Sequence, residues 1–365
     1  MATNESSSNK SKEPQPRSPG RRRFAATGLA LASAVSWPLI LTPGKARAAE
    51  RLVVANWGGG VAAAKKAAYY DPFTKETGIP IVQVYGPELA KIIAQVRAQD
   101  VEWDVVDLVD SWVAPGEHMG LYEEIDTSIV PMSRVSPLAR RKYELGTHFY
   151  AGGIARSTSR FAAGKRPDTW SDFWNVAKFP GRRGLRPRIG ETLEIALLAD
   201  GVPPESVYPC DVERGFRSLD KIKPHVQQWI AETPQTTSLI QSNEVDFTYT
   251  YVSRVFESVK AGLPIDFSHA NNLIGRNWHA VIKGTRNKSA AMHFTEFVTR
   301  PDRQLAFCNI TGHAPVTIGV AEKIDPRIKA WVPQPTAKGN LVLDPDWWFG
   351  KEEALTQRFK EWLLV

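Results

Sequence analysis

The chain has 365 residues, 42% of them hydrophobic and 23% charged, which is the composition of an ordinary globular protein. Its formal net charge is +7, but residues 1–48 hold eight basic and two acidic side chains, so only about +1 remains for the rest and a nucleic-acid-binding surface is excluded. Two cysteines, Cys210 and Cys308, are too few for a disulfide scaffold or a cysteine-rich iron–sulfur enzyme. We expect both to be buried free thiols, with a single disulfide between them as the alternative.

The N-terminal segment has the pattern of an export signal. Basic residues that end around Arg21 and Arg22 precede a mostly apolar run, and Ala46 and Ala48 form an A-x-A cleavage site. An arginine pair before an apolar run is typical of the twin-arginine export route. A membrane anchor is the alternative, but glycine, serine and proline interrupt the run, which barely reaches the roughly 20 residues that a spanning helix needs. We therefore predict a twin-arginine-type signal peptide over residues 1–48, cleaved near Ala48, and a periplasmic protein.

Strand and helix patterns alternate directly after this signal. Short apolar runs predict buried strands at residues 52–55, 81–84 and 104–109. A glycine turn that begins at Gly58 opens an alanine-rich helix, and a second helix is predicted from Pro87, with apolar residues at helical spacing. This order predicts a parallel sheet with helices on both faces.

The second half repeats this style with shorter segments. Thr169 and Asp172 have the spacing of a helix capping box. Strands are predicted at residues 184–186 and 246–250, and helices at residues 192–199, 252–259, 290–298 and 355–363. We expect the apolar stripes of these helices to pack in the core. About 317 residues follow the signal, more than one hydrophobic core usually holds, so the sequence predicts an α/β protein with two lobes.

The sequence lacks the common catalytic motifs. No two of the seven histidines are four residues apart, so a helical two-histidine zinc site is absent. The G-x-S-x-G, G-x-G-x-x-G and P-loop patterns are also missing, which disfavours serine hydrolases and nucleotide-binding enzymes. We therefore expect no enzyme activity, no cofactor and no metal. Gly58 follows a strand, where backbone N–H groups could meet a ligand oxygen, with a plain tight turn as the alternative.

Six segments resemble, in order and spacing, the spermidine/putrescine-type solute-binding proteins of bacterial ABC importers. They are Asn56-Trp57, Pro72 to Ile79, Trp103 to Val106, Thr169 to Trp174, Arg300-Pro301-Asp302 and Gly312 to Pro315. The likeness implies a two-lobed, hinged clamp of the type II periplasmic-binding fold, with lobe 1 at residues 49–152 and 278–322 and lobe 2 at residues 153–277 and 323–365. It also implies a small-molecule ligand, membrane permease subunits as partners, a monomer and no nucleic acid.

The likeness assigns a ligand site as well. Its candidate residues are aromatic or charged: Trp57, Asp110, Trp112, Glu191, Tyr251, His313 and Trp348, with Trp278 as a further candidate. Aromatic rings and carboxylates suit an amine through cation–π attraction and charge-assisted hydrogen bonds. Core packing is the alternative for the aromatic residues, a helix cap for Asp110, and a turn role for His313.

The chain departs from the family pattern where acids are expected. Arg188 stands in place of an acid three residues before Glu191, Asn277 in place of an aspartate, and Gly275 in place of a tryptophan, beside Arg276. A buried cation that faces an unpaired arginine would be strongly disfavoured. We predict a polyamine-like or zwitterionic amine as the ligand. The alternative is an anionic carboxylate or phosphonate held by Arg188 and Arg276. An exported enzyme with a cofactor and a surface interaction protein are further alternatives.

Overall fold

The computed structural model describes residues 51–365, which lie within one compact unit. The predicted signal peptide, with Arg21, Arg22, Ala46 and Ala48, lies outside the described residues. Over the described range, helices are all too short or too polar to cross a membrane.

The strands within residues 51–365 form one mixed sheet. Their bounds are β1 Leu52–Asn56, β2 Ile81–Tyr85, β3 Val105–Leu108, β4 Glu144–Ser157, β5 Arg183–Leu185, β6 Val226–Trp229, β7 Phe247–Tyr251, β8 Ile265–Phe267, β9 Leu273–Val281 and β10 Leu341–Val342. The strand order is β2-β1-β3-β9-β4-β7-β5-β6, while β10 pairs with β9 and β8 pairs with β4.

The prediction of a parallel sheet is right at both ends of this order and wrong in the middle. β1 runs parallel to β2 and β3, and β5 runs parallel to β6 and β7. Between them, β9 pairs antiparallel with β3 and β4, and β4 pairs antiparallel with β7. These two long strands, which join the ends of the sheet, were not predicted.

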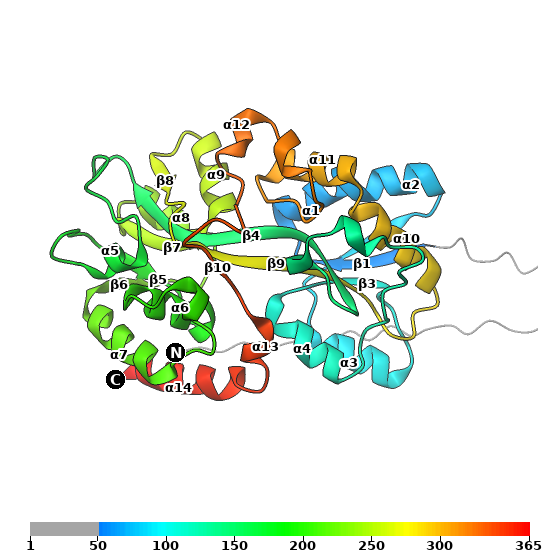
Figure 1. Cartoon of the computed structure of the whole chain (residues 1–365), viewed down its shortest axis with the longest axis horizontal. Coiled ribbons are helices and arrows are strands. Elements are labelled where there is room, and N and C mark those ends of the chain that lie inside the picture. The colour runs from blue at the N-terminus through cyan, green and yellow to red at the C-terminus, as the bar shows by residue number, and fades with distance from the viewer. Residues whose placement is uncertain (1–50) are drawn as a thin grey trace, which may run out of the picture. The chain divides into compact units, whose positions relative to one another are not determined.

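Helices cover both faces of the sheet (Figure 1). The α-helices are α1 Gly59–Lys65, α2 Asp71–Thr77, α3 Leu89–Ala98, α4 Asp110–His118, α5 Trp170–Trp174, α6 Ile189–Ala199, α7 Val212–Ile222, α8 Gln235–Gln241, α9 Val252–Lys260, α10 Lys288–Val298, α11 Pro301–Thr311, α12 Pro326–Lys329, α13 Pro345–Trp348 and α14 Glu352–Leu364. A π-helical turn, η1 Lys66–Tyr70, connects α1 to α2.

Local sequence signals explain several helix ends. The Thr169 side chain accepts from the Asp172 backbone and Asp172 accepts from the Thr169 backbone, which is the predicted capping box of α5. Pro301 is the first residue of α11. A backbone N–H at this position has no partner within a helix, so proline loses no hydrogen bond there. The helix predicted from Pro87 begins instead at Leu89, with Glu88 as its N-cap in an extended conformation.

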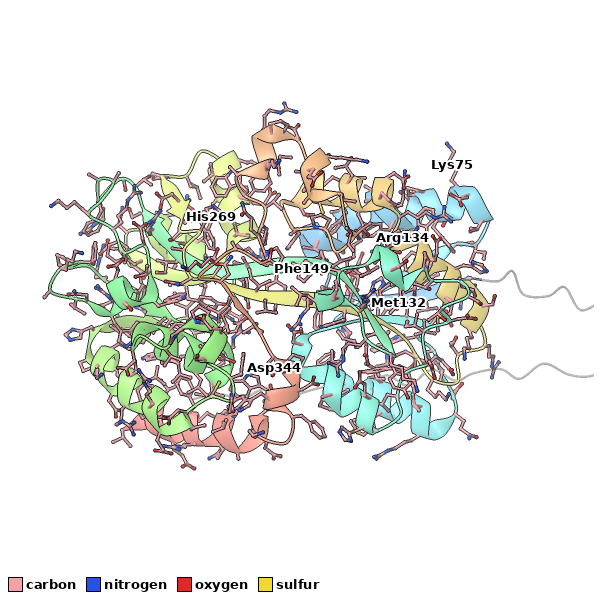
Figure 2. The ribbon with its side chains drawn as sticks, viewed as in Figure 1. Lys75, Met132, Arg134, Phe149, His269 and Asp344 are labelled. Carbon is pink, nitrogen blue, oxygen red and sulfur yellow. The ribbon has the colours of Figure 1, made fainter. Side chains whose placement is uncertain are left out.

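Buried apolar side chains gather on both faces of the sheet. One group includes Phe149 of β4, which Figure 2 labels, together with residues of α9, α10 and α11. A second group joins α5, α6 and α7 to α14, and a third packs α3 and α4 against β3 and β9. Cys210 and Cys308 are both buried free thiols, as predicted.

Candidate ligand-binding site

A cavity of about 240 Å³ lies where α4, α6 and the segment from β10 to α14 meet the sheet. Its lining residues are Val109, Asp110, Ser111, Tyr150, Arg188, Ile189, Gly190, Glu191, Glu194, Tyr251, Leu343, Asp344, Pro345, Trp348, Glu352 and Thr356. Asp344 lies on the segment that runs from β10 to α13 (Figure 2). The carboxyl ends of β3 and β7 deliver Asp110 and Tyr251, as expected for ligand sites of α/β sheets.

Asp110 is the first residue of α4, and its carboxylate is fully engaged by β9. It accepts hydrogen bonds from the Trp278 indole at 2.8 Å and from the Arg276 backbone at 3.2 Å. The Arg276 guanidinium lies 3.0 Å from the same carboxylate. Burial raises the pKa of Asp110, and the nearby charge of Arg276 opposes that rise. Asp110 therefore faces the cavity as one half of a neutral ion pair.

Arg188 and Glu191 form a second pair that lines the cavity. The Arg188 guanidinium donates to the Glu191 carboxylate and to the Tyr251 hydroxyl. The Tyr251 hydroxyl in turn lies 3.3 Å from the Glu191 carboxylate, so the three side chains contact one another. Glu191 has a φ of +66°, which is rare for a residue with a side chain and marks a locally strained backbone. The start of α6 thus holds one positive and one negative charge beside the cavity.

Two aromatic rings, Tyr150 and Tyr251, also line the cavity. The Tyr150 ring of β4 meets the Tyr251 ring edge-on, with centroids 5.5 Å apart and planes at 87°. Tyr150 can lie there because Gly275 has no side chain: a Cβ atom at that position would overlap the Tyr150 ring. The space that the family pattern assigns to an aromatic residue at position 275 is therefore filled by a ring from the neighbouring strand.

Glu194 also lines the cavity, although it was not among the candidates predicted from the sequence. Its side chain is fully buried, and one carboxylate oxygen accepts from the Trp348 indole and the Tyr208 hydroxyl, both at 2.7 Å. The other oxygen, Oε2, has no hydrogen-bond partner among the described residues. Burial raises the pKa of Glu194 to about 7, against the effect of the two hydrogen bonds. A lone acid inside the apolar run of α6 was the signal that could have revealed it.

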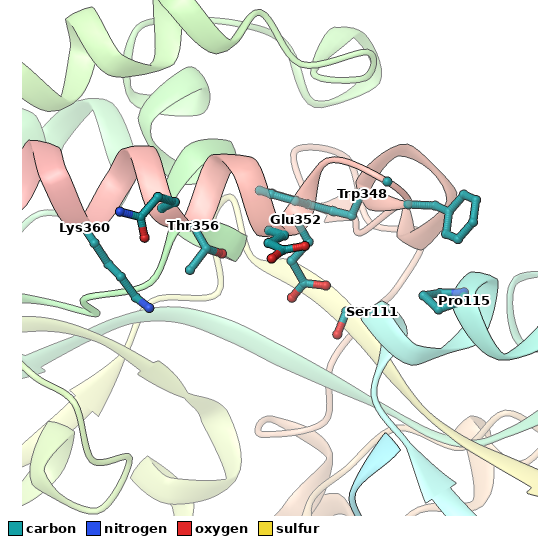
Figure 3. Close-up of a pocket in the computed structure, with 10 residues that line it drawn as sticks. Ser111, Pro115, Trp348, Glu352, Thr356 and Lys360 are labelled. Carbon is teal, nitrogen blue, oxygen red and sulfur yellow. The ribbon is translucent and has the colours of Figure 1, made fainter. Parts of the chain in front are cut away.

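An open pocket of about 610 Å³ adjoins the cavity and shares Ser111, Trp348, Glu352 and Thr356 with it. Figure 3 shows that α14 presents Glu352, Thr356 and Lys360 toward this pocket, while Ser111 comes from α4 on the other side. The cavity therefore opens outward between α4 and α14.

Trp57, Gly58, Trp112 and Asn277 form a neighbouring group that does not line the cavity. The Trp57 indole donates to the Asn277 amide at 3.2 Å, and the Trp57 and Trp112 rings lie 5.4 Å apart. Trp57 remains 39% exposed, so its ring is available to a ligand or to a moving lobe. The backbone N–H of Gly58 already donates to the Asn56 side chain, which removes it as a free anion donor.

The remaining candidates lie in the interior. Trp278 is buried and uses its indole to hold Asp110, and His313 is buried next to the His148 ring. The donors of Arg276 reach the backbone oxygens of Leu138 and Leu343 in addition to Asp110. Arg188, whose side chain is 43% exposed, is therefore better placed than Arg276 to bind an anion.

A buried ion pair lies next to Asn277. The Lys65 ammonium of α1 contacts the Asp107 carboxylate of β3, and both side chains are almost completely buried. Asp107 also accepts from the Asn277 amide at 3.2 Å, and its other neighbour is the His279 ring at 2.8 Å. The pair therefore fixes Asn277, which in turn holds Trp57.

Comparison with known proteins identifies the chain. The model of the family described as bacterial extracellular solute-binding protein matches residues 68–336. The chain belongs to this family. This solute-binding protein is 32% identical to the gamma-aminobutyric acid-binding protein of Pseudomonas aeruginosa over 324 residues, which are 86% of this chain and 91% of that protein.

The chain is also similar to a solved structure and to a more distant relative. A solved structure described as the Atu4243–GABA receptor matches with a TM-score of 0.79 and 32% identity, covering 86% of this chain and 98% of that one. The spermidine/putrescine-binding periplasmic protein of Escherichia coli is 21% identical over 268 residues, 71% of this chain and 76% of that protein. The resemblance seen in the sequence is thus confirmed at the level of the family, while polyamine binding is named only for the more distant relatives.

The family defines the general role of the chain. It is a two-lobed α/β solute-binding protein, a non-enzymatic component of an ABC transporter that binds a small molecule and delivers it to the permease. The family is extracellular or periplasmic.

Proposed function

We propose that this solute-binding protein captures a small zwitterion, an amino acid whose amine and carboxylate are separated by a short methylene chain. The observation that carries the proposal is the pairing of Arg188 with Glu191 on one wall of the cavity. The ammonium group of such a ligand can pair with Glu191 and its carboxylate with Arg188. Neither side chain is then left as an unpaired buried charge.

Ligands with one kind of charge fit this wall less well. A diamine would find Glu191 but would also meet the cationic Arg188, and a dicarboxylate would find Arg188 but would also meet Glu191. Asp110 offers no free charge to either, because Arg276 already neutralises it. Like charges that approach each other in a partly desolvated site are costly. The Arg188–Glu191 pair therefore favours a zwitterion over the polyamine and the anionic ligand, which were both possible from the sequence.

The size and surface of the cavity favour a short ligand. Its volume of about 240 Å³ is below the roughly 300–1,000 Å³ of drug-sized pockets. Tyr150 and Tyr251 offer ring faces that suit methylene groups between two charged ends. The 32% identity to the gamma-aminobutyric acid-binding protein supports the same class of ligand.

We further propose that the two lobes have the boundaries expected from the sequence, 49–152 with 278–322 and 153–277 with 323–365. One aromatic contact inside each proposed lobe supports this division. The α11 ring of Phe307 stacks on Tyr69 of η1, with centroids 5.2 Å apart. The α14 ring of Phe359 meets Phe216 of α7, with centroids 6.4 Å apart. The chain would then cross between the lobes within β4, within β9 and near residue 322, and closure would bring Asp110 toward Arg188.

A thermal-shift panel tests the proposed ligand class. Gamma-aminobutyrate is expected to raise the melting temperature, because a ligand at 100 times its Kd stabilises the folded state by about 2.7 kcal/mol. Butanoate and butylamine are matched controls, since each lacks one of the two charges, and both should have a much smaller effect. Stronger stabilisation by putrescine would favour the polyamine alternative, and stronger stabilisation by succinate would favour the anionic one. Either result would contradict the proposal.

A further inference from the structure

We propose that Glu194 binds the ammonium group of the ligand together with Glu191, and that Glu194 exchanges a proton for that group on binding. This inference rests on the proposed function, because it assigns one end of the zwitterion to a specific carboxylate. Neither the family pattern nor the sequence resemblance pointed to this position.

The first step is the balance of charge around the cavity. Asp110 is neutralised by Arg276, and Glu191 by Arg188. Glu194 has no cationic partner among the described residues; its two hydrogen bonds come from an indole and a phenol, which are neutral. It is therefore the buried carboxyl group of the cavity whose charge remains unpaired.

The second step concerns the unbonded oxygen. Glu194 is fully buried, and its Oε2 atom lacks a hydrogen-bond partner while Oε1 accepts two. A buried acceptor without a partner is unfavourable, and more so when it is charged. An ammonium group in the cavity can supply both the missing hydrogen bond and the missing positive charge. Tyr208 and Trp348 meanwhile hold the carboxylate in position from behind.

The third step is the state of Glu194 before the ligand arrives. The titratable and charged groups that face it or line the same cavity are Asp110, Tyr150, Arg188, Glu191, Tyr208, Cys210, Tyr251, Asp344 and Glu352. The nearby acids and the burial favour the protonated form, and the carboxyl group has a pKa of about 7. At neutral pH the empty site is therefore partly protonated. Binding of an ammonium group breaks the carboxyl O–H bond and releases this proton to water or buffer, and no other covalent bond changes.

Proton release makes binding depend on pH. Since the free carboxyl group has a pKa of about 7 and the bound carboxylate a lower one, the proton competes with the ligand below pH 7. The affinity for gamma-aminobutyrate should thus be about tenfold weaker at pH 6 than at pH 8, with about half a proton released per ligand at pH 7. The amine of gamma-aminobutyrate stays charged throughout this range.

Isothermal titration calorimetry of the whole mature protein tests the proposal. Gamma-aminobutyrate and putrescine are titrated at pH 6 and pH 8, and at pH 7 in two buffers of different ionisation enthalpy, which together count the protons released. Glu194→Gln keeps the size of the side chain and an acceptor for Trp348. It should weaken binding at pH 8 at least tenfold and abolish both the pH dependence and the proton release. Glu205→Gln, a change at an exposed glutamate of the same lobe, is the matched control and should behave as wild type.

The outcomes separate this inference from the proposed function. If gamma-aminobutyrate binds Glu194→Gln and the wild type alike, with the same pH dependence, the role of Glu194 is refuted and the zwitterion proposal stands. If putrescine binds with release of a proton and gamma-aminobutyrate does not bind, Glu194 is supported and the zwitterion proposal fails. If no compound with an amine binds, both are overturned. A melting temperature near that of wild type shows that Glu194→Gln is folded.

Discussion

Removal of the two charges of the Arg188–Glu191 pair, one at a time, should change the ligand preference in opposite directions. Arg188→Gln leaves Glu191 as a free acid, so diamines should gain relative to gamma-aminobutyrate. Glu191→Gln leaves Arg188 as a free cation, so dicarboxylates should gain. Both changes keep a polar side chain at the start of α6. The pair therefore offers a direct test of how the sign of charge selects the ligand.

The expected magnitudes follow from exposure. The Arg188 side chain is 43% exposed and the Glu191 side chain 11% exposed, so water screens the first more than the second. Hydrogen bonds to charged groups contribute about 1.5–3 kcal/mol, and 1.4 kcal/mol corresponds to a tenfold change in Kd. We expect Arg188→Gln to weaken binding of gamma-aminobutyrate roughly tenfold and Glu191→Gln roughly a hundredfold.

Calorimetric titration with gamma-aminobutyrate, putrescine and succinate measures both effects. Arg217→Gln and Glu205→Gln, at exposed positions of the same lobe, are the control variants. The reasoning is refuted if each variant loses affinity for all three compounds by the same factor, because that pattern indicates a general disturbance of the cavity. It is equally refuted if gamma-aminobutyrate binding is unchanged in both variants.

Three further predictions concern stability. Asp107→Asn leaves the buried Lys65 without its anion and should lower the free energy of unfolding in urea by about 3–5 kcal/mol; a loss below 1 kcal/mol would show that the pair is not isolated from water. Burial raises the pKa of Glu144 to about 9, so the folded state holds this proton more tightly than the unfolded chain, and the stability contributed by the group is lost as pH rises. Glu144→Gln should therefore raise the melting temperature more at pH 8 than at pH 5 by calorimetry, and an equal gain at both would disprove this. Asp346→Ala removes a half-exposed partner of Arg141, 2.9 Å away, and should cost at most about 1 kcal/mol, less in 1 M salt; a larger, salt-independent loss would contradict a solvent-screened contact.

Local sequence patterns predicted five of the strands, β1, β2, β3, β5 and β7, and half of the α-helices. The run at 52–55 became β1, because continuous apolar residues suit a strand that is covered on both faces, and the run at 81–84 became the edge strand β2, which is only partly buried. The capping box at Thr169 formed as expected, because it depends on residues three apart. β4 and β9 were not recognised, because their polar residues are satisfied by partners that lie far away in the chain, such as Asn277 with Asp107.

The candidate site was predicted in part. Asp110, Glu191 and Trp348 do line one cavity, whereas Trp278 and His313 lie in the interior. A position in the sequence shows that a side chain is near the end of a strand, but the direction of that side chain depends on its neighbours in the sheet.

The sequence alone determined the α/β class, the family and the non-enzymatic role, because these depend on periodicity and on short motifs in a recognisable order. Only the tertiary structure decided which charges are free. Asp110 and Arg276 are 166 residues apart and neutralise each other, while Arg188 pairs with Glu191 and Glu194 has no cationic partner among the described residues. Electrostatic energy depends on distance in space and on burial, and neither quantity can be read from the order of residues.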